Sequence, residues 1–203
     1  MITNPRRKKQ MDEFWDKEHS VMHQYYEVLE KKISQSKLLE KMQELIKKDP
    51  DFYDSYVVAA DILESMDKKE MAAALRSTAF ERAMHRIVDK EGNFPKRIEW
   101  GWLDNRHLVR SIECWAQELW GQGKNEEALD LFRKLLKANP HDNIGARHNI
   151  LAIRLGLGPD YESKFETKDM PGYLDAIKVM EWFDKNVKKF PEEFEWWLKS
   201  VKE

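Results

Sequence analysis

Cysteine, glycine, proline and long apolar runs are all scarce in this chain of 203 residues. Its single cysteine, Cys114, excludes an intrachain disulfide. Eight glycines and seven prolines are few for an all-β fold with its many turns, and no alternating strand pattern persists. No stretch approaches the roughly 18 apolar residues that cross a bilayer. These absences favour a helical protein that lies outside the membrane.

An excess of positive charge is also missing, because the formal net charge is -2. Nucleic-acid-binding domains are normally strongly basic, so nucleic acid is an unlikely partner. We interpret the one dense basic run, Arg6 to Lys9, as a solvated arm, with a nucleic-acid or membrane contact as the alternative. The polar start MITNPRRKKQ has no apolar signal-peptide core, so we expect a soluble, cytoplasmic protein.

What the chain does have is apolar residues that recur every three or four positions, the pattern of amphipathic helices. The eight tryptophans favour a packed interior over disorder. A break over residues 91–102 is followed by Asp104 or Asn105 as an N-cap candidate. The expected helices cover about residues 8–33, 38–49, 52–63, 71–87, 105–121, 125–138, 144–155, 173–189 and 194–198.

Residues 109–142 have the spacing of a 34-residue helix–turn–helix unit. Two small residues let the helices approach closely, an aromatic ring fills the seam between them, and a proline ends the second helix. The pattern residues are Ala116, Leu119, Ala128, Phe132 and Pro140. This unit resembles a tetratricopeptide repeat, and residues 51–156 resemble that family more loosely. After Pro50 a second repeat is degenerate, because Arg76 stands where a large apolar residue is expected.

The resemblance implies an all-α fold, an antiparallel array of helix hairpins (a TPR-like α-solenoid) with aromatic C-terminal capping helices. We expect one domain over residues 1–203, with N-terminal helices at 1–50, a repeat core at 51–156 and a cap at 157–203. The segment GWLDNRHLVRS also resembles uncharacterised bacterial repeat proteins. The family implies a non-enzymatic module without a cofactor that binds a peptide or partner segment in its groove.

The groove positions that the family implies fall on three expected helices. They are Arg110, Glu113, Gln117 and Trp120 in the clear repeat, Arg147, Leu151 and Arg154 in the next helix, and Asp54, Val57, Asp61 and Glu64 in the degenerate repeat. The three arginines could grip a carboxylate through paired charge-assisted hydrogen bonds. Alternatively, they pair with acids of the chain itself, such as Glu113 or Asp142.

An aromatic and polar cluster stands at the entrance to the clear repeat, formed by Trp100, Trp102, Asn105 and Arg106. Tryptophan and arginine dominate binding hot spots, so Trp102 and Arg106 are further candidates for partner binding. The same residues could instead seal the end of the helical stack.

The alternative functions are a metal-dependent enzyme or regulator and a nucleic-acid-binding repeat protein. His19 and His23 are four residues apart on an expected helix and could face one metal, or they are two exposed histidines. Cys114 lies about two helical turns from His107, which is too far for activation of the thiol. The segment GQGKNEE suits a turn between helices better than a phosphate loop.

The tail carries an unusual aromatic load: Trp182, Phe183, Phe190, Phe194, Trp196 and Trp197. A terminal repeat element normally keeps a polar outer face. We therefore expect this tail to fold back and cap the array, with a homodimer contact as the alternative.

Overall fold

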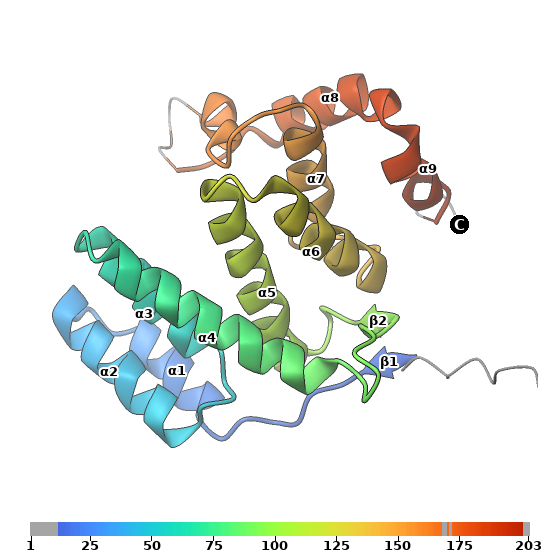
Figure 1. Cartoon of the computed structure of the whole chain (residues 1–203). Helices are drawn as coiled ribbons and strands as arrows, with labels where there is room; N and C mark the ends of the chain where they lie inside the picture. The colour runs from blue at the N-terminus through green and yellow to red at the C-terminus, as the bar shows by residue number, and fades with distance from the viewer. Residues whose placement is uncertain (1–11, 168–169, 171, 201–203) are drawn as a thin grey trace, which may run out of the picture.

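The computed structural model describes residues 12–167, 170 and 172–200, and these residues are mostly helical (Figure 1). The elements are β1 Glu13–Phe14, α1 Met22–Leu29, α2 Gln35–Lys48, α3 Asp54–Ser65, α4 Lys69–Ile87, β2 Arg97–Ile98, α5 Leu103–Gly121, α6 Asn125–Ala138, α7 Ala146–Arg154, η1 Tyr161–Phe165, α8 Ala176–Asn186, η2 Val187–Lys189 and α9 Pro191–Ser200. The all-α class is thus confirmed, with one short pair of strands beside the helices. Within the described ranges, no helix is both long and apolar enough to cross a membrane.

Helices that are neighbours in the sequence also pack against one another from α1 to α7, and α3 additionally contacts α5 (Figure 1). Short turns connect α3 to α4 and α5 to α6, so each pair forms a hairpin. In the α5–α6 hairpin, Ala116, Ala128 and Phe132 are completely buried. Small side chains at the seam allow this close approach of two helices, as the repeat pattern predicts.

The turns that end α3, α5 and α7 share one backbone geometry. Asp67, Gly123 and Gly156 take positive φ angles of 60°, 77° and 72°. The residue after each of them donates its N–H to the carbonyl oxygen five residues back, at 2.9, 2.9 and 3.0 Å. This is the C-terminal capping motif that favours glycine, and aspartate tolerates it. GQGKNEE therefore contains a turn, as expected. The α3–α4 hairpin closes with the same turn geometry as the α5–α6 hairpin.

The helix predicted over residues 8–33 is confirmed only for Met22–Leu29, which form α1, and is wrong for the described residues before Met22. The preceding arm is extended, and β1 pairs in parallel with β2. The backbone N–H of Asp16 donates to Asn105 Oδ1 at 2.9 Å, so a partner far along the chain holds the arm. Asn105 is therefore a buried anchor and does not cap α5, whose N-cap residue is Trp102. The basic run Arg6 to Lys9 lies outside the described residues.

The aromatic tail packs back onto the helices that precede it (Figure 1). Phe194 and Trp197 are buried, while Trp196 is only half-buried. The indole N–H of Trp197 donates to the carbonyl oxygen of Pro140 at 2.8 Å, just after α6 ends. The expected helix over residues 173–189 begins three residues later than predicted, at Ala176, and its last turn is a 3-10 helix.

Candidate functional site: a cavity along α5

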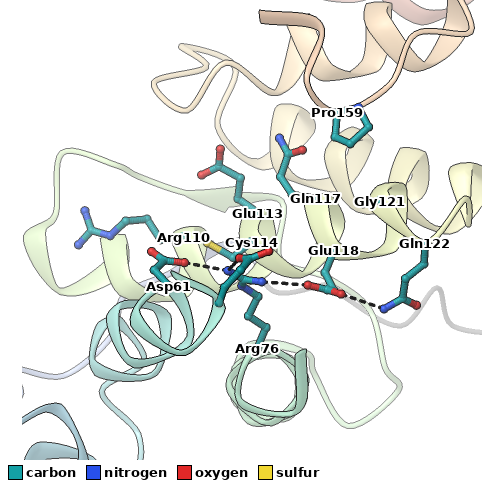
Figure 2. Close-up of a pocket in the computed structure, with 11 residues that line it drawn as sticks. Asp61, Arg76, Arg110, Glu113, Cys114, Gln117, Glu118, Gly121, Gln122 and Pro159 are labelled. Carbon is teal, nitrogen blue, oxygen red and sulfur yellow. Dashed lines mark hydrogen bonds and ion pairs between the residues drawn. The ribbon is translucent and has the colours of Figure 1, made fainter. Parts of the chain in front are cut away.

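One face of α5 lines a cavity of about 580 Å³, which we call the α5 cavity (Figure 2). Residues at 110, 113, 114, 117, 118 and 121 recur every three or four positions, so the helix turns them all toward the same side. Helix α3 contributes Asp61 and Glu64, and α4 contributes Arg76. The loop after α7 closes one end with Pro159. The walls therefore combine α3, α4 and α5 with the start of the C-terminal region.

Arg76 is an ionic crosslink between the two hairpins. Its guanidinium donates to Asp61 at 2.9 Å, to Glu64 at 2.5 Å and to Glu118 of α5 at 3.0 Å (Figure 2). Burial alone would lower the pKa of Arg76, but these hydrogen bonds raise it above its ordinary value. The sequence pattern led us to expect a large apolar residue at position 76. Arg76 instead links α3, α4 and α5 through its ion pairs. Three carboxylates of the chain already surround its positive charge, so a ligand's carboxylate would have to compete with them.

Arg110 is similarly occupied. Its Nε donates to Asp54 Oδ1 at 2.8 Å, and its terminal nitrogen bonds the other carboxylate oxygen. Burial would lower the pKa of Arg110, but the bonds to Asp54 raise it, so the guanidinium stays charged. Asp54 is the first residue of α3 and is buried. This bidentate pair ties α5 to α3 at one end of the cavity.

Glu113 and Gln117 are different, because they lie one turn apart on α5 and have no hydrogen bond or ion pair within the described chain. Figure 2 shows both side chains pointing away from the carboxylates around Arg76. Burial raises the pKa of Glu113 to about 7, and the charges of Asp142 and Glu162 add to this effect. Glu113 therefore titrates near neutral pH, which is a property found often at functional sites.

The remaining groove candidates lie elsewhere. Trp120 is buried, and its indole N–H donates to the carbonyl oxygen of Leu157 at 3.2 Å. Arg147 bonds Asp142 at 2.7 Å, and its guanidinium lies over the ring of Trp197. Of the sequence-predicted groove residues, the α5 cavity brings together Arg110, Glu113, Gln117, Asp61 and Glu64.

Arg154 lines a separate pocket beside α9, where it bonds Glu192 at 2.6 Å. The three arginines that we expected to grip a carboxylate therefore do not share one cavity. Each is paired with an acid of the chain instead. For Arg147 that acid is Asp142, the residue named in the alternative hypothesis.

The cluster at the entrance to α5 is divided between the interior and the surface. The guanidinium of Arg106 donates to the carbonyl oxygen of Trp100 at 3.0 Å and lies over the Trp100 ring. Trp102 is 45% exposed and stacks on Trp15, with the ring centroids 4.7 Å apart. Arg106 thus seals the loop, whereas the two stacked tryptophans form an exposed aromatic surface.

The two histidines of the metal hypothesis occupy different environments. His19 precedes α1 and is buried, whereas His23 is exposed and pairs with Glu27 at 3.2 Å. The expectation of two exposed histidines is wrong for His19. The hypothesis of a metal shared by His19 and His23 is not supported either, because His19 faces Asp16 and Asp49.

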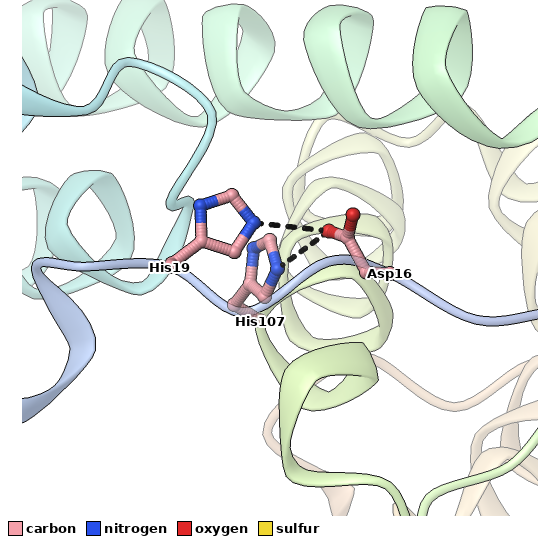
Figure 3. A group of neighbouring side chains, drawn as sticks. All are labelled: Asp16, His19 and His107. Carbon is pink, nitrogen blue, oxygen red and sulfur yellow. Dashed lines mark hydrogen bonds and ion pairs between the residues drawn. The ribbon is translucent and has the colours of Figure 1, made fainter.

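A buried cluster that the sequence did not suggest joins Asp16, His19 and His107 (Figure 3). Asp16 Oδ2 accepts hydrogen bonds from His19 Nε2 at 3.1 Å and His107 Nε2 at 3.0 Å. Arg86 bonds the other oxygen of Asp16, with its Nε at 2.7 Å. Two histidines and a carboxylate are a common set of metal ligands, so this cluster is a candidate metal site.

The hydrogen bonds argue against metal binding. The backbone N–H of Tyr53 donates to His107 Nδ1 at 3.1 Å, so the proton of a neutral His107 ring must be on Nε2, the atom that would face the metal. Burial lowers the pKa of His107, which keeps the ring neutral. The arrangement is therefore a closed hydrogen-bonded network.

His19 is the cationic member of this network. Its Nδ1 bonds Asp49 at 2.8 Å while its Nε2 bonds Asp16, so a doubly protonated ring donates to a carboxylate on each side. Burial would lower the pKa of His19, but these two bonds raise it above its ordinary value. The network fastens the N-terminal arm to α5 and to the end of α2.

Cys114 lines the α5 cavity but is a poor nucleophile. Burial, together with the neighbouring charge of Glu113, raises the pKa of its thiol to about 12. The thiolate is the reactive form of cysteine, and little of it is present near neutral pH.

Comparison with known proteins returned no matching family model, curated protein or solved structure. The tetratricopeptide assignment therefore stays a prediction from the sequence.

Proposed function

We propose that this protein is a non-enzymatic, cytoplasmic interaction module that binds an extended segment of a protein partner in the α5 cavity. The observation that carries the proposal is the pair Glu113 and Gln117, two polar side chains directed into a cavity of about 580 Å³ without partners among the described residues. Buried or half-buried polar groups are normally hydrogen-bonded, so groups left unpaired in a cavity suit a ligand that bonds them.

We further propose that the helix hairpins form a TPR-like array. Sequential packing from α2 to α7, the contact between α3 and α5, and the shared turn at Asp67 and Gly123 support this assignment. In such arrays the first helix of each hairpin lines the concave side. Helices α3 and α5 are the first helices of their hairpins, and both line the α5 cavity.

Filling the cavity tests the proposal. In Gln117→Trp the indole occupies the space that we assign to the partner segment. Gln43→Trp is the matched control, because Gln43 is an exposed residue inside α2 and lies outside the α5 cavity. Both variants and the wild type are used at equal concentration to capture proteins from native lysate, after their melting temperatures have been compared.

We expect specific partners to be recovered with the wild type and with Gln43→Trp, and to be depleted with Gln117→Trp. If folded Gln117→Trp recovers the same partners in the same amounts, the α5 cavity is not the binding site.

A further inference from the structure

The cavity walls have more negative than positive charge to offer a ligand. Four carboxylates and two guanidinium groups line the cavity. Both guanidinium groups already bond carboxylates of the chain, Arg76 to three of them and Arg110 to Asp54. A ligand carboxylate would therefore have to compete with these acids for its hydrogen bonds. The sequence suggested a site where arginines bind a ligand's carboxylate, whereas these walls favour a ligand with positive charge.

Among the charged groups that line the cavity, the carboxylate of Glu113 is the one without a partner in the described part of the chain. Its desolvation is not compensated by any hydrogen bond within the described chain, and Asp142 and Glu162 repel its negative charge. Arg110 is the nearby cation that opposes this repulsion, but it is bound to Asp54. A cation placed beside Glu113 would restore the missing interaction.

Gln117 supplies a second recognition element one turn further along α5. A primary amide can both donate to a backbone carbonyl and accept from a backbone N–H. Glu113 thus offers a negative charge to a side chain of the ligand, and Gln117 offers an amide to the ligand's peptide backbone. Both lie on one face of α5 (Figure 2).

We propose that the α5 cavity recognises an arginine side chain of the partner segment, with Glu113 as the carboxylate that pairs with the guanidinium and Gln117 as the group that bonds the adjacent backbone. This inference rests on the proposed function of binding a partner segment. Arginine is favoured over lysine because its planar guanidinium makes two parallel hydrogen bonds to a carboxylate.

The test begins with a phage-displayed library of random heptapeptides, selected against the wild-type protein and counter-selected against Gln117→Trp. The strongest peptide is then synthesised twice, once with its arginine and once with citrulline, the neutral isostere of arginine. Affinities of both peptides are measured for the wild type, for Glu113→Gln and for Glu127→Gln. Glu127 is an exposed residue of α6 outside the α5 cavity, so its variant is the matched control.

We expect the selected peptides to share an arginine, and we expect Glu113→Gln to bind the arginine peptide roughly tenfold to a hundredfold more weakly than the wild type at pH 8. The citrulline peptide should bind the wild type more weakly than the arginine peptide does, by a similar factor. Its affinity for Glu113→Gln should be little lower than its affinity for the wild type, because either change alone already removes the pair of arginine and Glu113. Glu127→Gln should match the wild type.

Peptides that require an open cavity but show no preference for arginine would overturn this inference and leave the proposed function standing. The inference would also be overturned if the factors by which citrulline and Glu113→Gln each weaken binding multiply when both changes are combined. If no peptide discriminates the wild type from Gln117→Trp, the proposed function fails, and the inference fails with it. Spermidine binding as tightly as the peptide in calorimetry would assign the site to a free organic cation instead.

Discussion

Replacing Glu113 by glutamine should stabilise the protein at high pH and leave its stability unchanged at low pH. The pKa of Glu113 is raised from 4.5 to about 7 in the folded protein. The folded state therefore binds the proton more tightly than the unfolded state does. The stability that this proton contributes is fully present below about pH 4.5 and is lost as the pH rises through about 7. Glutamine has nearly the same shape and no charge, so it avoids that loss.

The magnitude follows from the shift in pKa. One pKa unit corresponds to about 1.36 kcal/mol, so full expression of this shift corresponds to roughly 3 kcal/mol at pH 8. Glu113 is only half-buried by its exposed area, and solvent screens part of the penalty. We therefore expect Glu113→Gln to raise the free energy of unfolding by about 1–2 kcal/mol at pH 8, which is roughly 2–8 °C in melting temperature for a chain of this size.

Urea unfolding of wild type and Glu113→Gln at pH 4 and pH 8 measures this difference, with Glu127→Gln as the matched control. The gain should be near zero at pH 4, where both states of the wild type are protonated. A gain that does not depend on pH, or a less stable Glu113→Gln protein at pH 8, would refute the reasoning. A stabilising variant that also loses its ligand would show that Glu113 is kept for binding at a cost in stability.

One substitution tests the buried network, two further changes test the packing of the helices, and one measurement tests metal binding. His19→Ala removes the donor shared by two carboxylates and should lower the free energy of unfolding by about 3–5 kcal/mol in urea; a loss under 1 kcal/mol would contradict the network. Ala128→Glu places a carboxylate in the α5–α6 seam and should lower the melting temperature severely, so an unchanged value would count against that seam. Deleting residues 191–203 removes two buried aromatic rings and should destabilise the chain, whereas a soluble monomer of unchanged stability would exclude a capping role. Elemental analysis of untagged protein should find no stoichiometric zinc or iron, because the His107 ring carries its proton on the atom that would bind the metal; one equivalent of metal would reverse that assignment.

Helix positions in the middle of the chain could be predicted because their causes are local. The predicted range 125–138 coincides with α6, and the ends of α4 and α5 were placed correctly. Apolar spacing and the turn residue that follows a helix depend only on neighbours in the chain. The same local geometry put Arg110, Glu113 and Gln117 on one helix face, so part of the candidate site was also predictable.

The N-terminal arm shows where this reasoning fails. Its apolar residues have helical spacing, yet residues 13–14 pair with a segment more than 80 residues away, and Asn105 bonds the backbone of the arm. Long-range pairing outweighs a weak local preference for helix. The spacing of residues within the arm carries no information about its pairing with β2.

The sequence by itself determined that the protein is helical, roughly where most of its helices lie, and which side chains share a face of α5. Only the tertiary structure decided which of those side chains are already paired. Arg110 meets Asp54 across 56 positions and Asp16 meets His107 across 91, so each charge depends on how distant helices pack. For the same reason, Glu113 has no such partner among the residues that the structure describes. Pairing between side chains depends on distances in space, which local patterns do not encode.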